Sequence, residues 1–185
     1  RFGMAEETGR ILNDAIIRGA AAGQGLGEAI GSYMNQAANQ FPNRRTSILA
    51  TGVRLGIPVT VHVAVGTDII HMHPSADGAA IGATSLLDFR RLTAVVARME
   101  GGVYVNIGSS VILPEVFLKT LSLGRNLGHP ISNITTANMD FLVHYRPQTN
   151  VVRRPTQKGG QGYSLTGHHE IMLPLLAAAV LEELG

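Results

Sequence analysis

The strongest constraint on the fold is the alternation of strand-like and helix-like segments after Pro58. In the first of them Val59, Val61 and Val63 alternate with polar residues, and this period of two is typical of a strand. The strand-like segments are 58–64 and 103–107, with weaker candidates at 131–136 and 141–144. The helix-like segments are 84–99, 111–126 and 171–184. This order predicts an α/β fold with a Rossmann-like parallel sheet and flanking helices.

The residues before Pro58 have helical patterns instead. Apolar side chains recur at helical spacing over 5–19, 28–40 and 47–55. We therefore expect one α/β domain over residues 1–185, with a helical lead-in at 1–46 and the core at 47–185. The chain opens on Arg1 and its first methionine is Met4, so we expect an amino-terminally incomplete copy of the fold.

Composition excludes several classes of function. The chain contains no cysteine, which excludes disulfides, thiolate nucleophiles, iron–sulfur clusters and cysteine-bearing zinc sites. The net charge of +2 comes without a run of four basic residues, so nucleic acid is not an expected partner. The longest apolar run, 171–181, is too short to span a bilayer. We expect a soluble, cytoplasmic protein with no membrane partner.

The turn Gly108-Ser109-Ser110 is the first candidate ligand site. It lies between the end of a predicted strand and the start of a helix, where backbone N–H groups and the helix dipole favour phosphate or carboxylate. The alternative is a tight turn that needs small residues for packing, since the full dinucleotide fingerprint is absent.

The loop that follows the strand 58–64 is the second candidate. Asp68 can hold a substrate amine or a ribose. His71 and His73 are two residues apart, so in an extended segment both face the same way and can share a metal ion. A third ligand would come from the segment His168-His169-Glu170, which can equally cap the final helix.

A glycine-rich stretch, 145–165, reads as a long functional loop. Its basic residues Arg146, Arg153, Arg154 and Lys158 can clamp an anion, or they can be a solvated surface. Lys158 is one of only two lysines, and a desolvated lysine can form an imine with a substrate. Upstream, the segment 135–140 offers either ligand contacts at a strand end or an Asx turn.

In order and spacing, several of these features resemble the deoxyhypusine synthase family. The resembling segments are Ile57-Pro58-Val59, Gly66-Thr67-Asp68, Asp88-Phe89-Arg90-Arg91-Leu92, Val103 to Ser110, Thr136-Ala137 and Leu173-Pro174-Leu175-Leu176. The resemblance covers most of the chain, from Ser47 onward. It implies a Rossmann-like fold, NAD as cofactor, and a homo-oligomer (dimer or tetramer) with active sites at subunit interfaces.

The resemblance also implies roles for individual residues. Asp68 would orient the substrate amine, and Lys158 is the nearest counterpart of the catalytic lysine. The residues expected to contact the cofactor are Gly108, Ser109, Ser110, Thr136, Ala137 and His168.

The chain departs from the family pattern around the substrate. The family's three-glycine turn is Gly108-Ser109-Ser110 here, and its histidine pair is replaced by Pro114-Glu115. The loop that holds the polyamine is rich in arginine and lacks tryptophan, which suits an anionic ligand better.

Three readings of function follow. The first is a deoxyhypusine synthase-like protein with a divergent substrate, which binds NAD or a related nucleotide and, if catalytic, is an NAD-dependent transferase acting through an amine or imine step. The second is a metal-dependent hydrolase built on His71 and His73. The third is a non-catalytic oligomeric domain that binds a ligand.

Overall fold

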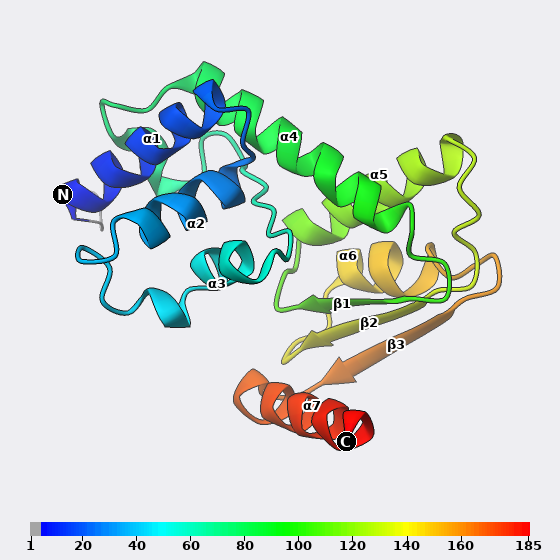
Figure 1. Ribbon diagram of the computed structural model, residues 1–185. Coiled ribbons are helices and arrows are strands. Elements are labelled where there is room, and N and C mark those ends of the chain that lie inside the picture. Colours follow the sequence, from blue (N-terminus) through cyan, green and yellow to red (C-terminus); the bar gives the residue numbers. More distant parts are fainter. Residues whose placement is uncertain (1–4) are drawn as a thin grey trace. The chain divides into compact units, whose positions relative to one another are not determined.

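The computed structural model describes residues 5–185, which form two compact units (Figure 1). The division falls between Leu92 and Thr93, inside helix α4 (Gly78–Val96). The boundary that we predicted between residues 46 and 47 lies within the first unit. Each unit is described by itself below.

The N-terminal unit is helical. Its elements are α1 (Glu6–Ala21), α2 (Leu26–Gln36), the short 3₁₀ turn η1 (Arg44–Thr46), α3 (Ile48–Leu55), the 3₁₀ turn η2 (Ile69–Met72) and the first part of α4. The three predicted helices are present with small shifts of their ends. The core is formed by Ala15, Ile16, Leu26, Ile30, Ala80 and Ile81.

Local sequence explains the bounds of α3. The Ser47 hydroxyl accepts a hydrogen bond from the Ala50 amide at 3.3 Å, which satisfies one of the free N–H groups of the first turn. Gly56 ends the helix with φ of 67°, a conformation that glycine adopts at little cost.

Asp88 joins three segments of the N-terminal unit. Its buried Oδ2 accepts hydrogen bonds from the amides of Gly27 and Val61, both at 2.9 Å. α4 begins at Gly78, earlier than the start at residue 84 that the sequence predicts, so Asp88 lies inside the helix. Asp77 lies before the first turn of α4 and accepts from the Ala80 amide at 2.9 Å.

The segment 58–64 forms no β-sheet, in contrast to the predicted strand. Side chains take the backbone amides that a neighbouring strand would need. The Val61 amide donates to Asp88, the Val63 amide to the Ser85 hydroxyl at 3.4 Å, and the Ala64 amide to Asp68 at 3.0 Å. The period of two in the sequence therefore reflects an extended segment held by side chains.

The C-terminal unit is α/β. Its elements are β1 (Val103–Ile107), α5 (Ile112–Asn126), β2 (Thr135–Asp140), α6 (Tyr145–Pro147), the π-helical turn η3 (Gln148–Arg153), β3 (Gln161–Thr166) and α7 (His169–Leu184). The three strands are parallel in the order β1-β2-β3, with Ile107 opposite Met139 and Asp140 opposite Thr166. This arrangement confirms an α/β fold with a parallel sheet flanked by helices and is compatible with a Rossmann-like class.

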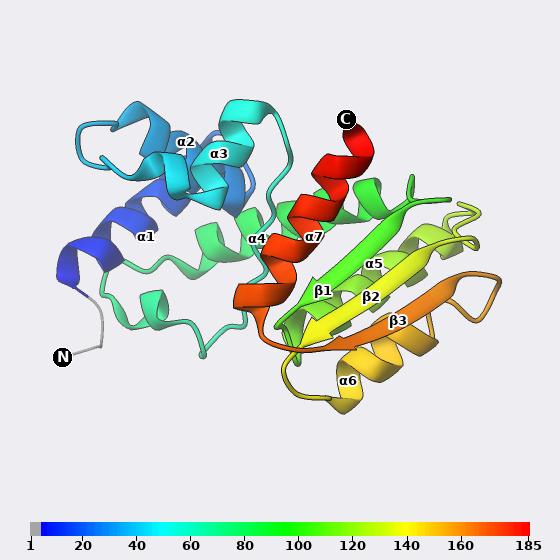
Figure 2. The ribbon, with the colours of Figure 1, turned by 90° about the horizontal axis from the view of Figure 1, so that it is seen from below.

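One face of the sheet is covered by α5, α6 and η3 (Figure 2). On this face Tyr104 of β1 stacks on the fully buried Phe117 of α5, with ring centroids 3.6 Å apart. The Thr136 hydroxyl of β2 donates to the Val151 carbonyl of η3 at 2.7 Å. Gly162 of β3 lets η3 approach closely, since an added Cβ would lie 2.2 Å from the Val152 carbonyl oxygen. On the opposite face, Met139 of β2 is buried, whereas Tyr163 and Leu165 of β3 are exposed.

Three of our predictions in this unit are wrong. The second strand spans 135–140 instead of 131–136, and 141–144 is an irregular connection. The presumed long loop 145–165 contains α6, η3 and most of β3. In contrast, β1, the start of α5 with Pro114 in its first turn, and α7 agree with the sequence patterns.

Residues 5–185 contain no helix with both the length and the apolar character required to cross a membrane.

The stacked Tyr104 predicts a loss of stability at alkaline pH. Burial raises the pKa of Tyr104 to about 12, above its ordinary value of 10 in an unfolded chain. The unfolded state thus loses its proton first, so stability should fall as pH rises from about 10 to 12. Urea unfolding of the C-terminal unit at several pH values tests this. The loss of unfolding free energy per pH unit should be smaller in Tyr104→Phe than in the parent. It should be unchanged in Tyr145→Phe, because Tyr145 is exposed.

Candidate functional site at the carboxyl edge of the sheet

The three parallel strands bring three connections to one edge. Gly108 follows β1, residues 141–144 follow β2, and Gly167 and His168 follow β3. The arrowheads in Figure 1 point to this edge. Ligands of open parallel sheets bind at such carboxyl ends, so this edge is the candidate site.

Two asparagines form a buried polar pair just inside this edge. Asn106 of β1 donates from Nδ2 to Asn138 Oδ1 of β2 at 2.7 Å and to the Ser109 carbonyl at 2.9 Å. The contact with a carbonyl assigns the amide nitrogen to this side of Asn106. Asn106 Oδ1 is then buried with no hydrogen-bond partner among the described residues. The site thus contains an acceptor that suits a ligand hydroxyl or amide.

The turn after β1 is tightly built. Gly108 has φ of 66°, and its amide donates to the Met139 carbonyl at 3.0 Å. The Ser109 hydroxyl accepts from the Leu113 amide at 3.2 Å, so it caps the first turn of α5. Ser110 is half-buried at the same turn. Because α5 starts here, its positive dipole end faces the carboxyl edge of the sheet.

The first turn of α7 closes one side of this turn. The imidazole of His169 lies against Gly108, where an added Cβ would be 3.2 Å from Nε2. His169 Nδ1 is buried without a hydrogen-bond partner in the described part of the chain. His168 is exposed and provides no side-chain cap to α7. His169 therefore fits the site better than the predicted His168.

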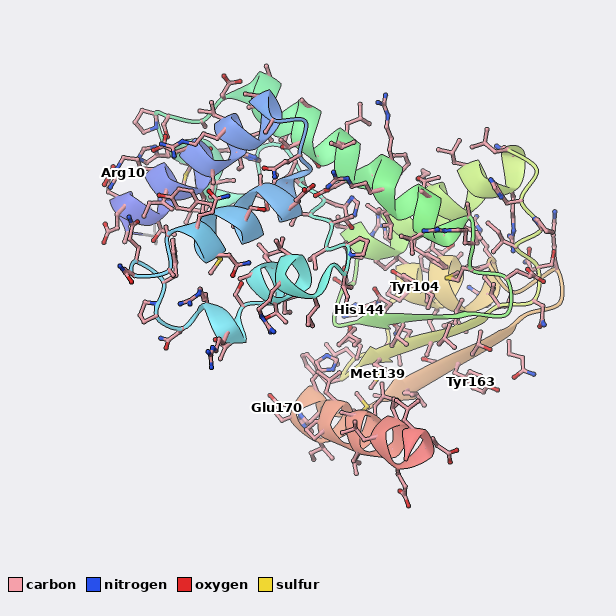
Figure 3. The ribbon with its side chains drawn as sticks, viewed as in Figure 1. Arg10, Tyr104, Met139, His144, Tyr163 and Glu170 are labelled. Carbon is pink, nitrogen blue, oxygen red and sulfur yellow. The ribbon has the colours of Figure 1, made fainter. Side chains whose placement is uncertain are left out.

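A carboxylate and a further histidine follow β2. Asp140 is buried, and its Oδ2 lies 4.0 Å from His144 Nε2. Asp140 Oδ1 accepts from the Phe141 amide at 2.8 Å. Figure 3 shows His144 and Met139 at the same end of the sheet as Glu170 in the first turn of α7. This end of the sheet is thus rich in polar groups.

Two predicted cofactor residues lie away from this edge. Thr136 is the second residue of β2, fully buried and bonded to η3, and Ala137 follows it on the opposite face. Their predicted place at a strand end depended on a strand that ended at 136. Since β2 continues to Asp140, the structure does not bring Thr136 and Ala137 together with Gly108.

The two predicted catalytic residues, Lys158 and Asp68, belong to different units. Lys158 is exposed and precedes β3, at the amino edge of the sheet. With a rise of about 3.3 Å per residue, the strand places Lys158 roughly 20 Å from the carboxyl edge. Asp68 belongs to the N-terminal unit, where its carboxylate accepts from the Ala64 amide at 3.0 Å and closes a turn.

The histidine pair of the N-terminal unit does not form a metal site. The segment around His71 is a 3₁₀ turn instead of an extended chain. His71 Nδ1 accepts from the Gly66 amide at 3.2 Å. His73 Nδ1 faces the Ser75 hydroxyl at 2.7 Å, and its Nε2 lies 3.4 Å from Glu6 Oε1. Within residues 5–185 no three potential ligands are grouped closely enough to hold a metal ion.

Comparisons with known proteins give no relative. No protein-family model, no curated protein and no solved structure matches the chain. The geometry of the site therefore carries the argument about function.

Sequence reasoning missed Asn106 and gave His169 only a minor place. The available signal was the alternation along β1, where Asn106 shares the helix-covered face with Tyr104. A polar residue at a position of that face is unusual unless it has a partner. The contact of His169 with Gly108 joins residues distant in sequence and left no local signal.

Proposed function

We propose that the chain binds NAD or a related nucleotide at the carboxyl edge of its sheet, as a divergent deoxyhypusine synthase-like protein. One observation carries the proposal: the turn Gly108-Ser109-Ser110 joins β1 to the N-terminus of α5 directly beside the buried acceptor Asn106 Oδ1. The turn and helix dipole suit a pyrophosphate, and the acceptor suits a ribose hydroxyl or a carboxamide N–H.

The groups at this edge fit the two ends of a dinucleotide. Amide dipoles of α5 and the imidazole of His169 can serve the anionic part, and the pair Asn106–Asn138 can serve a neutral hydrogen-bonding part. NAD, when bound, accepts a hydride from the substrate carbon.

Imine chemistry on Lys158 has no support at this edge. The only other lysine, Lys119, lies on α5 and pairs with Glu115 at 3.2 Å. This favours a second candidate function, namely nucleotide binding without a covalent lysine step. The two candidates share the same site and differ in the role of Lys158.

A glutamate at position 110 should weaken NAD binding at least tenfold. The new carboxylate would lie in the turn that faces the phosphates and would repel them. Calorimetric titration of NAD into the full chain measures the effect in Ser110→Glu. Ser122→Glu, on the exposed side of the same helix, is the matched control and should bind like the parent.

The titration has two outcomes that contradict the proposal. One is a parent protein that does not bind NAD, and the other is equal affinity in Ser110→Glu and Ser122→Glu. Lys158→Ala separates the candidates further. Unchanged NAD affinity with loss of turnover of an amine substrate would indicate the covalent step.

A further inference from the structure

A histidine and a buried carboxylate meet at the carboxyl end of the central strand. Asp140 is the last residue of β2 and is 4% exposed, and its Oδ2 lies 4.0 Å from Nε2 of His144. Its other oxygen, Oδ1, accepts from the Phe141 amide, so Oδ2 is the oxygen that faces the ring. Of the three histidines at this edge, His144 is the one that faces a carboxylate within residues 5–185.

This pair lies beside the buried asparagines, on the same face of the sheet. Side chains of a strand alternate between faces, and Thr136 of β2 bonds to η3, so Asn138 and Asp140 face the same helices. Two residues along a strand span about 7 Å, which places Asp140 next to the pair Asn106–Asn138. All these residues belong to the C-terminal unit. The edge that we propose for a nucleotide therefore also contains a group that can accept a proton.

The position of the carboxylate decides which ring nitrogen can accept that proton. With Oδ2 of Asp140 at Nε2, the hydrogen of the neutral ring stays on Nε2, and Nδ1 keeps its free electron pair. The buried carboxylate then compensates the positive charge that the ring gains with a proton. The separation of 4.0 Å is longer than a hydrogen bond, and catalytic contacts of this kind often shorten only when the ligand is bound.

We propose that His144 is the proton acceptor of this site, that Asp140 positions it, and that the substrate is an alcohol. The proposal rests on nucleotide binding at the same edge and specifies the reaction there. The covalent route of an amine requires a lysine, and Lys158 lies before β3 at the amino edge of the sheet. Oxidation of an alcohol requires only a base within reach of the hydroxyl.

The reaction breaks two bonds of the alcohol and forms no covalent bond to the protein. The O–H bond breaks, and its proton goes to Nδ1 of His144. The C–H bond at the same carbon breaks, and its electron pair leaves as hydride to the nicotinamide of the bound NAD. The carbon–oxygen bond becomes a double bond, so the alcohol is oxidised to an aldehyde or ketone while the nicotinamide is reduced.

The chemical reactivity of His144 tests the pair without any nucleotide. Diethyl pyrocarbonate acylates a ring nitrogen with a free electron pair, and peptide mass spectrometry gives the rate at each histidine of the full chain. His144 should react about fivefold or more faster than His129, because a carboxylate activates it, although His129 is exposed and His144 is half-buried. Asp140→Asn keeps an oxygen for the Phe141 amide and should remove this difference, with an unchanged circular dichroism spectrum. Glu170→Gln, at the same end of the sheet in Figure 3, is the matched control and should preserve the difference.

Turnover tests the substrate class. The residues that connect Asp140 to His144 are Phe141, Leu142 and Val143, so the test panel consists of apolar alcohols, namely isopropanol, cyclohexanol and benzyl alcohol. With NAD, the full chain should oxidise at least one of them. His144→Gln should lower kcat about 100-fold or more, the usual contribution of a general base, with KM and the calorimetric affinity for NAD unchanged. Imidazole in the buffer should restore part of the rate to His144→Ala, which a merely structural role of the side chain would not allow.

Three results would overturn the proposal. They are equal acylation of His144 and His129 in the parent, a His144→Gln variant with the kcat of the parent, and a parent that binds NAD but oxidises none of the three alcohols. A parent that does not bind NAD contradicts the proposed nucleotide site instead. The acylation rates are measured without NAD, so they test the pair of Asp140 and His144 separately from nucleotide binding.

Discussion

Asp88→Ala is expected to lower the free energy of unfolding of the N-terminal unit by about 3 kcal/mol, since hydrogen bonds to a charged group each contribute about 1.5–3 kcal/mol. The carboxylate receives the amides of Gly27 and Val61, one from the first turn of α2 and one from the extended segment 58–64. Alanine would leave both N–H groups buried without an acceptor. Urea unfolding measures the loss, and hydrogen exchange of peptides from α2 and 58–64 should show faster exchange.

Two further variants isolate the cause. Asp14→Ala removes a half-buried carboxylate that has no hydrogen bond or ion pair with any of residues 5–185, and its effect should stay within about 0.5 kcal/mol. Asp88→Asn keeps one oxygen acceptor and should lose less stability than Asp88→Ala. If Asp88→Ala unfolds like the parent, the carboxylate does not hold these segments together.

Phe117→Ala is expected to destabilise the C-terminal unit by about 3–5 kcal/mol, the usual cost of removing a buried aromatic ring. Phe117 has no exposed surface, and it stacks on Tyr104 between α5 and the sheet. The truncation would leave a cavity in this contact. The chain has no tryptophan, so the near-ultraviolet circular dichroism of tyrosine can report the lost packing together with urea unfolding.

The matched control lies on the same helix. Leu123 is 37% exposed, so Leu123→Ala should cost about 1 kcal/mol or less. Equal effects of the two substitutions would contradict the central place of Phe117 in this unit.

Local signals in the sequence were enough to predict some of the helices and strands. The bounds of β1 and α7 and the start of α5 follow from hydrophobic period, flanking glycine and Pro114 in the first turn. The end of α3 follows from Gly56. In these cases the local preference and the final structure agree.

Other elements depend on contacts between distant residues. The segment 135–140 contains Asn138 and Asp140, residue types that are depleted in strands, yet it forms the central strand because β1 and β3 both pair with it. Two glycines, Gly160 and Gly162, weaken the strand signal around β3, although η3 requires the close approach at Gly162. In segment 58–64, side-chain acceptors replace a pairing strand.

In the candidate site, too, some features follow from local sequence and others depend on contacts between distant residues. The turn Gly108-Ser109-Ser110 could be predicted because strand, small residues and helix are adjacent in sequence. The error at Thr136 follows directly from the shifted bounds of β2. His169 and the unpartnered Asn106 oxygen become visible only when three strands are aligned.

The close backbone approaches at glycine predict how this sequence can diverge. At Gly27 and Gly162 a Cβ would meet the carbonyl oxygens of Val59 and Val152 at 2.1 and 2.2 Å, whereas at Gly78 and Gly82 nothing lies within 4 Å. Natural selection should therefore retain glycine at 27 and 162 in every functional descendant of the chain. At 78 and 82 other residues should accumulate freely, and alanine should be common there, since it favours the helix.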